Sequence, residues 1–253
     1  MPERGKSAPA AAKGATRMAS LPKRFYSQVG IKDEGAGGAS LRLDGKPMHT
    51  PGKAPLVLPN RRLAEAVAEE WRQQGTRIDP QIMPLTRLAN SVIDGVKERE
   101  SAVIDDILAY AGSDLVCYRA EGPERLVELQ SRHWDPAVAW AETELGAPLR
   151  PAQGVVHVGQ PEASLQEIKQ RLKGFDTWSL AALHVMTGLT GSALLALAVA
   201  LGRLSPEEAW DAAHVDEDWQ ISQWGEDEEA RTRRENRRRD FAAAARLLKL
   251  LRG

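Results

Sequence analysis

The chain has 253 residues, of which 42% are hydrophobic and 27% are charged, so it has the composition of a globular protein with one large domain or two modest ones. Its formal net charge of -1 provides no overall attraction to nucleic acid or to an anionic membrane. Cys117 is the single cysteine, which excludes an internal disulfide and fits a reducing compartment.

The first residues predict a disordered tail over 1–21. Residues 1–20 are rich in Ala, Lys, Arg, Ser and Gly and lack the apolar core of a secretory signal. They resemble a mitochondrial presequence weakly, and Pro2 and Glu3 argue against one. We therefore expect a bacterial cytoplasmic location, with the mitochondrial matrix as the alternative.

The next segment reads as short strands. Side chains alternate over 25–31, and a Gly-rich turn follows at 35–38. Leu41 and Leu43 share one face and lead into Asp44-Gly45, a strong hairpin signal. With the extended run 56–58, these segments predict a small antiparallel meander.

A helix is expected after Asn60, which is a good N-cap. Leu63, Val67 and Trp71 follow at intervals of four and define its apolar face. A Pro-containing connector and a second helix over 85–96 complete a predicted β-rich α+β domain over 22–100.

From Ser101 onward the patterns are mainly helical and predict a helical bundle over 101–253, apart from a short extended piece at 115–118 and a brief non-helical segment at 155–158. Pro136 is expected in the first turn of a helix, and Ser164-x-x-Glu167 is expected to form a capping box. Ser205-Pro206-Glu207-Glu208 is a stronger start signal of the same kind. Strands followed by helices make the fold class α+β.

The apolar stretch 180–202 is long enough to cross a membrane. His184 interrupts it, and Gly188 and Gly191 divide it near the middle. Two buried helices that meet at a tight turn explain this pattern better than a membrane span does. We therefore expect no membrane insertion.

The usual catalytic signatures are missing from the sequence. It contains no P-loop and no nucleophile elbow around Ser192, and its histidines are not spaced as metal ligands. The adjacent acids Asp105 and Asp106 diverge by about 100° on a helix and form no ready dyad. We therefore expect no catalytic residue, no metal and no cofactor.

Two tryptophans near the C-terminus lie among carboxylates. Trp219 and Trp224 are five residues apart on a predicted helix, so their rings point in different directions. An apolar ring among the acids Asp216–Asp218 suggests a surface that contacts a basic partner. The alternative is that both rings simply pack between helices.

The arginine-rich run 231–239 provides a second hypothesis, a nucleic-acid module. Glu235, Asp240 and the preceding acids dilute the positive charge, and no aromatic platform is interleaved. We therefore expect no nucleic-acid partner.

A longer series of residues resembles a known family. It consists of Arg24-Phe25-Tyr26, Leu43-Asp44-Gly45-Lys46-Pro47, Thr50-Pro51, Glu70-Trp71, Met83-Pro84-Leu85-Thr86, Asn90, Asp94, Asp114-Leu115, Tyr118-Arg119, Gln130, Trp134-Asp135-Pro136, Trp140, Glu217-x-Trp219-Gln220 and Trp224-Gly225. In order and spacing, over about residues 22–230, the series resembles the assembly chaperones for F-type ATP synthase. Trp219 stands where the family pattern has Phe or Tyr, and no motif follows Gly225.

The resemblance implies an ATP-independent chaperone, without enzyme activity, that binds the free alpha subunit of the F1 sector before that subunit pairs with beta. It also implies a β-rich N-terminal domain and a C-terminal helical bundle, and we expect a monomer. The resemblance places the main polar contact with the client at Glu217. The other expected partner-binding residues are Asp218, Trp219, Gln220 and Trp224.

A small-molecule enzyme is the rival hypothesis. A two-domain chain often holds ligands in the cleft between its domains, here near His49, Asp94 and Arg119. Only the two-domain layout motivates this reading.

Overall fold

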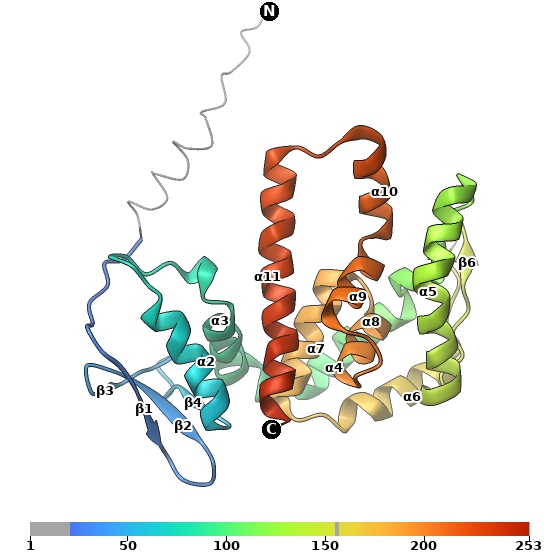
Figure 1. The fold of residues 1–253 in the computed structure, drawn as a ribbon. Helices are drawn as coiled ribbons and strands as arrows, with labels where there is room; N and C mark the ends of the chain where they lie inside the picture. The colour runs from blue at the N-terminus through green and yellow to red at the C-terminus, as the bar shows by residue number, and fades with distance from the viewer. Residues whose placement is uncertain (1–20, 155–156, 253) are drawn as a thin grey trace, which may run out of the picture. The chain divides into compact units, whose positions relative to one another are not determined.

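A computed structural model describes residues 21–154 and 157–252 (Figure 1). Except for Leu21, the predicted tail lies outside the described residues, as do Val155 and Val156 of the predicted non-helical segment. Packing divides the described residues into two compact units, one of residues 21–49 and 55–87 and one of residues 50–54, 88–154 and 157–252. The domains expected from sequence, 22–100 and 101–253, place the boundary later in the chain.

The first unit contains a small antiparallel sheet. Its strands are β1 (Val29–Asp33), β2 (Ala39–Leu43), β3 (Lys46–Pro47) and β4 (Val57–Leu58). β2 pairs with all of the other three, and Leu43 lies opposite both Val29 and Lys46.

The predicted hairpin turn is confirmed at Asp44-Gly45, where both residues have positive φ, 49° and 78°. The strand predicted over 25–31 begins only at Val29. The backbone N–H groups of Ser27 and Gln28 donate instead to the Asp44 carboxylate, at 3.0 and 2.8 Å. The turn therefore also anchors the chain that enters the sheet.

Helix α2 (Arg61–Arg72) packs on β1 and β2 with the predicted face of Leu63, Val67 and Trp71 buried. Asn60 caps it as predicted, accepting from the Leu63 N–H at 2.8 Å. A 3₁₀ turn (Pro80–Ile82) leads to α3 (Pro84–Ser91). The buried carboxylate of Glu70 accepts from the first free N–H groups of α3, those of Leu85 and Thr86, both at 2.7 Å.

The second unit is helical (Figure 1). A π turn (Val92–Val96), a 3₁₀ turn (Leu115–Cys117) and the parallel pair β5 (Tyr118–Arg119) and β6 (Ala152–Gln153) accompany eight further helices in the described part of the chain. These helices are α4 (Glu100–Gly112), α5 (Glu124–Leu145), α6 (Glu162–Lys173), α7 (Thr177–Thr190), α8 (Ala193–Ala200), α9 (Pro206–Ala213), α10 (Val215–Trp224) and α11 (Glu228–Leu251). An N-terminal antiparallel sheet followed by helices confirms the α+β fold class.

The apolar stretch forms two helices that meet at a glycine, as predicted. α7 ends at Gly191, whose φ is 71°, and Ser192 caps α8, all of whose residues are buried. The fully buried Asp114 accepts from the Leu194 N–H at 3.0 Å and so holds the start of α8. Within the described residues, no helix is both long enough and apolar enough to span a membrane.

Two local predictions in this unit are wrong. Pro136 lies in the interior of α5, which already starts at Glu124. Ser164 lies inside α6, where its hydroxyl donates to the Pro148 carbonyl at 2.6 Å instead of capping the helix. The second is a tertiary effect, since the buried Ser164 hydroxyl finds its partner outside α6. The capping box at Ser205 and Glu208 is confirmed.

Candidate functional site

Helix α10 carries all five residues expected to bind a partner, and their side chains lie on different faces of the helix. Val215, at its start, is the only one of its residues that is buried. Asp218 and Trp219 face α5, whereas Glu217 lies beside His214. Gln220 is exposed, and Trp224, at the C-terminal end, is 80% exposed. The reading that both tryptophans pack between helices is therefore wrong for Trp224.

One hydrogen bond ties the start of α10 to α5, and a second ties the end of α9 to α5. The buried amide of Gln130 donates to the Asp216 carboxylate at 2.7 Å and accepts from the Ala120 N–H at 2.8 Å. One turn further along α5, the indole N–H of Trp134 donates to the Ala212 carbonyl at 2.6 Å. These contacts give structural roles to Gln130 and Trp134, two members of the ordered series in the sequence.

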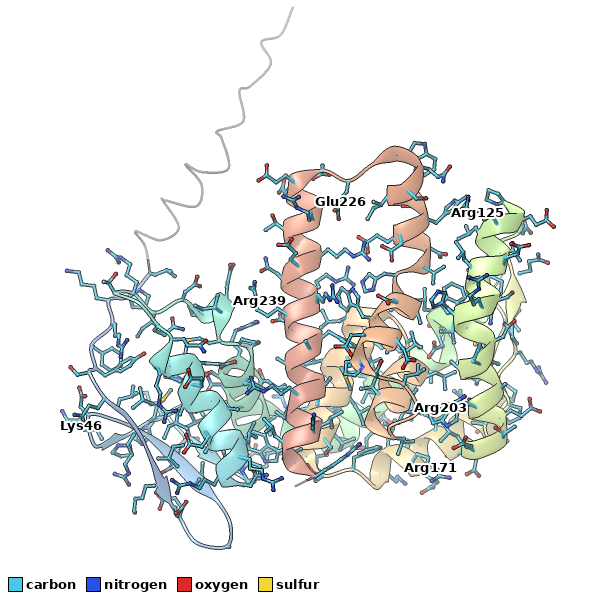
Figure 2. All side chains as sticks on the ribbon, viewed as in Figure 1. Lys46, Arg125, Arg171, Arg203, Glu226 and Arg239 are labelled. Atoms are coloured by element: carbon cyan, nitrogen blue, oxygen red, sulfur yellow. The ribbon has the colours of Figure 1, made fainter. Side chains whose placement is uncertain are left out.

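A groove of about 640 Å³ lies between α5 and α10. From α5 it is lined by Arg125, Leu129 and His133. From α9 and α10 it is lined by Asp211, Val215, Asp218, Trp219, Ser222 and Gln223. Figure 2 shows Arg125 near the start of α5, with side chains between this helix and α10.

The groove residues on α5 were not singled out from the sequence. Arg125, Leu129 and His133 follow at intervals of four, which places them on one face of the helix. This spacing is a signal in the sequence, but many helices have such a stripe. Only the position of α10 shows that this stripe faces a groove.

Helix α10 is also attached to α11 by an ion pair. Arg234 on α11 lies 2.5 Å from the Asp218 carboxylate, and the Arg234 side chain is only 19% exposed. Asp218 therefore lines the groove and holds the helix in place at the same time. Its charge is already balanced within the protein.

Glu217 lies close to a buried imidazole. The His214 ring stacks on Trp210 at 3.9 Å between centroids, and its Nδ1 donates to the Trp210 carbonyl at 2.7 Å. Burial lowers the pKa of His214, which favours the neutral ring. Its Nε2 lies 3.8 Å from the Glu217 carboxylate, so the neutral form makes no ion pair there. Glu217 is 40% exposed and can reach a partner.

The residues of the enzyme hypothesis are engaged in internal contacts. Asp94 accepts from the Thr50 hydroxyl at 2.5 Å and from the Gly52 N–H at 2.9 Å. Arg119 lies 2.7 Å from Asp135 and 5.2 Å from the centre of the Trp134 ring. His49 forms a β-bridge with Pro55. Over residues 21–154 and 157–252, no cluster of three His, Cys, Asp or Glu side chains could hold a metal ion.

The arginine-rich run forms part of α11, and several of its side chains have partners within the protein. Arg233 pairs with Glu229 at 3.4 Å, and Arg234 pairs with Asp218. Arg237 donates to the Leu189 carbonyl at 2.6 Å. These contacts explain the run as part of helix packing and surface charge balance.

Comparison with known proteins identifies the family. The model of the ATP12 chaperone protein family matches residues 23–142. The mitochondrial protein atp12 of Schizosaccharomyces pombe is 24% identical over 220 residues, which are 82% of this chain and 75% of that protein.

Solved structures extend the match over nearly the whole chain. A chaperone candidate from Agrobacterium tumefaciens has a TM-score of 0.88 and 46% identity, covering 98% of this chain and 92% of that one. Atp12 from Paracoccus denitrificans has a TM-score of 0.83 and 42% identity, covering 90% of this chain and 98% of that one. The family resemblance seen in the sequence is thereby confirmed: this chain belongs to the ATP12 chaperone family.

Proposed function

We propose that this protein promotes assembly of the F1 sector of ATP synthase by binding the free alpha subunit, without ATP and without enzymatic catalysis. Membership of the ATP12 chaperone family supports a chaperone, and the ordered residue series supports ATP synthase as the client complex. An unpaired subunit exposes an apolar interface that tends to aggregate. A chaperone must cover such a surface and later release it, so moderate affinity suits this role.

The observation that carries the proposal is the set of side chains that α10 exposes. This helix has one face on the groove, a half-exposed carboxylate at Glu217 and a tryptophan that is 80% exposed at its end. Large exposed apolar side chains next to polar groups are typical of protein-binding surfaces. Glu217 supplies a charge that could pair with a basic residue of the client and set its register.

The same residues expected from sequence remain our partner-binding set. They are Glu217, Asp218, Trp219, Gln220 and Trp224. The structure suggests a division of roles, in which Trp219 and Asp218 contact the client from the groove and Trp224 contacts it from the end of the helix. Glu217 and Gln220 would make polar contacts outside the groove.

We further propose that the protein acts as a monomer in a bacterial cytoplasm, with the mitochondrial matrix as the alternative. The solved structures from Agrobacterium tumefaciens and Paracoccus denitrificans, at 46% and 42% identity, support the bacterial location. The more distant Schizosaccharomyces pombe relative is mitochondrial.

The test is capture of the alpha subunit by the tagged full chain, together with the yield of assembled F1 in cells that lack the gene. We expect wild type to retain the free alpha subunit and to restore F1 yield. Glu217→Lys should keep the fold, as judged by circular dichroism, and lose capture.

Glu167→Lys provides the matched control, because Glu167 is an exposed acid on α6, away from the groove lining. It should behave as wild type. Normal F1 yield in the deletion strain, or failure of wild type to retain the alpha subunit, would refute the proposal. Loss of solubility in Glu217→Lys would instead make Glu217 a structural residue.

A further inference from the structure

One wall of the groove is α5, and the other is formed by α9 and α10, which run antiparallel to it in a fixed register. Gln130 bonds to Asp216, Trp134 bonds to Ala212, and the Arg125 guanidinium lies 6.0 Å from the centre of the Trp219 ring. Residue numbers along α5 thus rise as those along α9 and α10 fall. Arg125 marks one end of the groove, and Asp211 lies at the other.

Both walls offer side chains only. α5 and α10 are helices whose interior backbone N–H and C=O groups mostly bond within the helix, so the groove presents no strand edge for an incoming chain. An extended peptide would leave its own backbone groups unpaired there, whereas a helix satisfies them internally. The α5 stripe from residue 125 to 133 spans about 12 Å, which matches two turns of a helix.

The floor of the groove is apolar. Val215 is buried, and Leu129 and Trp219 are half-buried, so an apolar stripe laid along the groove would cover the rest of their surface. Helices that bind in grooves use such a stripe, with anchors spaced by three and four residues.

The ends of the groove have opposite charges that the described part of the chain leaves without ionic partners. Arg125 is exposed, and its contact is with the Trp219 ring and not with a carboxylate. Asp211 is exposed, and no basic side chain among the described residues pairs with it. Asp218, between them, is balanced by Arg234. The groove therefore favours a partner with an acid at one end and a base at the other.

We infer that the α5–α10 groove binds an amphipathic helix of the client, with an acidic side chain beside Arg125 and a basic side chain beside Asp211. This inference rests on the proposed function for the identity of the client, and it adds Arg125, Leu129 and Asp211 to the binding residues. It predicts that specificity follows the signs of the two end charges.

Three labelled helical peptides test the inference by fluorescence anisotropy. All three have the same leucine stripe and differ only at two end positions, which lie about two turns apart. The Glu/Lys peptide has Glu at the end that faces Arg125 and Lys at the end that faces Asp211. The Lys/Lys and Glu/Glu peptides have the same residue at both ends. The full-length proteins are wild type, Arg125→Glu and Asp211→Lys. Arg132→Glu is the control, because Arg132 is exposed on α5 but does not line the groove.

Wild type and Arg132→Glu should bind the Glu/Lys peptide most tightly. Arg125→Glu should prefer the Lys/Lys peptide and Asp211→Lys the Glu/Glu peptide, each by about fivefold over the Glu/Lys peptide. A Glu/Lys peptide with a central proline should bind at least about tenfold more weakly, because proline breaks the helix.

No saturable binding of the Glu/Lys peptide to wild type, an unchanged order of preference in the variants, or equal binding of the proline peptide would overturn the inference. Capture of the alpha subunit is measured in parallel. Capture without charge-dependent peptide binding would leave the proposed function standing and remove the helix-binding groove. Charge-dependent peptide binding without capture would leave the helix-binding groove standing and refute the proposed function.

Discussion

Asp218 on α10 and Arg234 on α11 form a 2.5 Å ion pair, and Asp218 also lines the groove. The start of α10 is tied to α5 through the hydrogen bond between Gln130 and Asp216. Val215 is the only buried residue of α10, so apolar packing holds this helix less than it holds the other helices. The polar contacts therefore contribute much of what keeps α10 in position. The helix that carries the expected client-binding residues is thus positioned mainly by charges and hydrogen bonds.

Removing the Arg234 charge should loosen α10. We expect Arg234→Gln to lower the free energy of unfolding by only about 1 kcal/mol, because Asp218 is about half exposed and solvent screens the pair. Hydrogen exchange of the α10 amides should speed up much more than that of α7 or α8. The exchanged pair Asp218→Arg with Arg234→Asp should restore protection. Arg233→Gln, which breaks an exposed pair on the same helix, should leave α10 unchanged.

Trp224 and Trp210 should respond in opposite ways to replacement by alanine. Trp224 is 80% exposed, so Trp224→Ala should change stability by no more than about 0.5 kcal/mol and should weaken capture of the client. Trp210 is buried against Phe241 and His214, so Trp210→Ala should cost about 3–5 kcal/mol. Thermal unfolding and pull-down of the alpha subunit measure the two effects. Unchanged capture by Trp224→Ala would show that this ring is not a contact.

Asp114 should make stability depend on pH. Burial raises the pKa of this carboxyl from its usual 3.8 to about 6, although Ser192 and the backbone N–H of Leu194 donate to it and oppose the change. Between these two pKa values, the folded chain therefore holds a proton on Asp114 that the unfolded chain has already released. The stability that Asp114 contributes is complete below about pH 4 and is lost as the pH rises through 6.

Comparison of wild type with Asp114→Asn isolates this effect. The stability of wild type relative to Asp114→Asn should fall by about 3 kcal/mol between pH 3.5 and 7. Urea unfolding at several pH values provides the measurement, with Asp211→Asn as an exposed control. A difference that is constant with pH would show that Asp114 does not hold the proton.

Gly52 should tolerate no side chain. A Cβ at this position would lie 2.7 Å from Oδ1 of Asp94, the carboxylate that accepts from the Thr50 hydroxyl and the Gly52 N–H. Gly52→Ala should therefore push Asp94 away and cost about 1–3 kcal/mol in denaturant unfolding. Gly112→Ala, where a Cβ would meet no atom within 4 Å, should cost nothing. Equal stability of the two variants would contradict the role of Asp94 as a clamp.

Local signals in the sequence predicted the parts of the fold in which neighbours along the chain make the decisive contacts. The Asn60 cap, the Asp44-Gly45 turn and the Ser205–Glu208 capping box each satisfy backbone groups within a few residues, and all three are confirmed. The wrong prediction at Ser164 depends on a partner outside its helix, because its hydroxyl bonds to the carbonyl of Pro148. The prediction at Pro136 is wrong because α5 already starts at Glu124.

The sequence by itself determined the α+β class, the family and the helix that carries Trp219 and Trp224, because periodicity, caps and ordered motifs are local properties. It could not determine which face of that helix is covered. Only the tertiary structure brings Arg125 and Leu129 opposite Trp219, and it does so through bonds between residues more than 70 positions apart, such as Gln130 with Asp216. The groove exists because two distant helices meet there, and a pattern within either helix carries no information about the other.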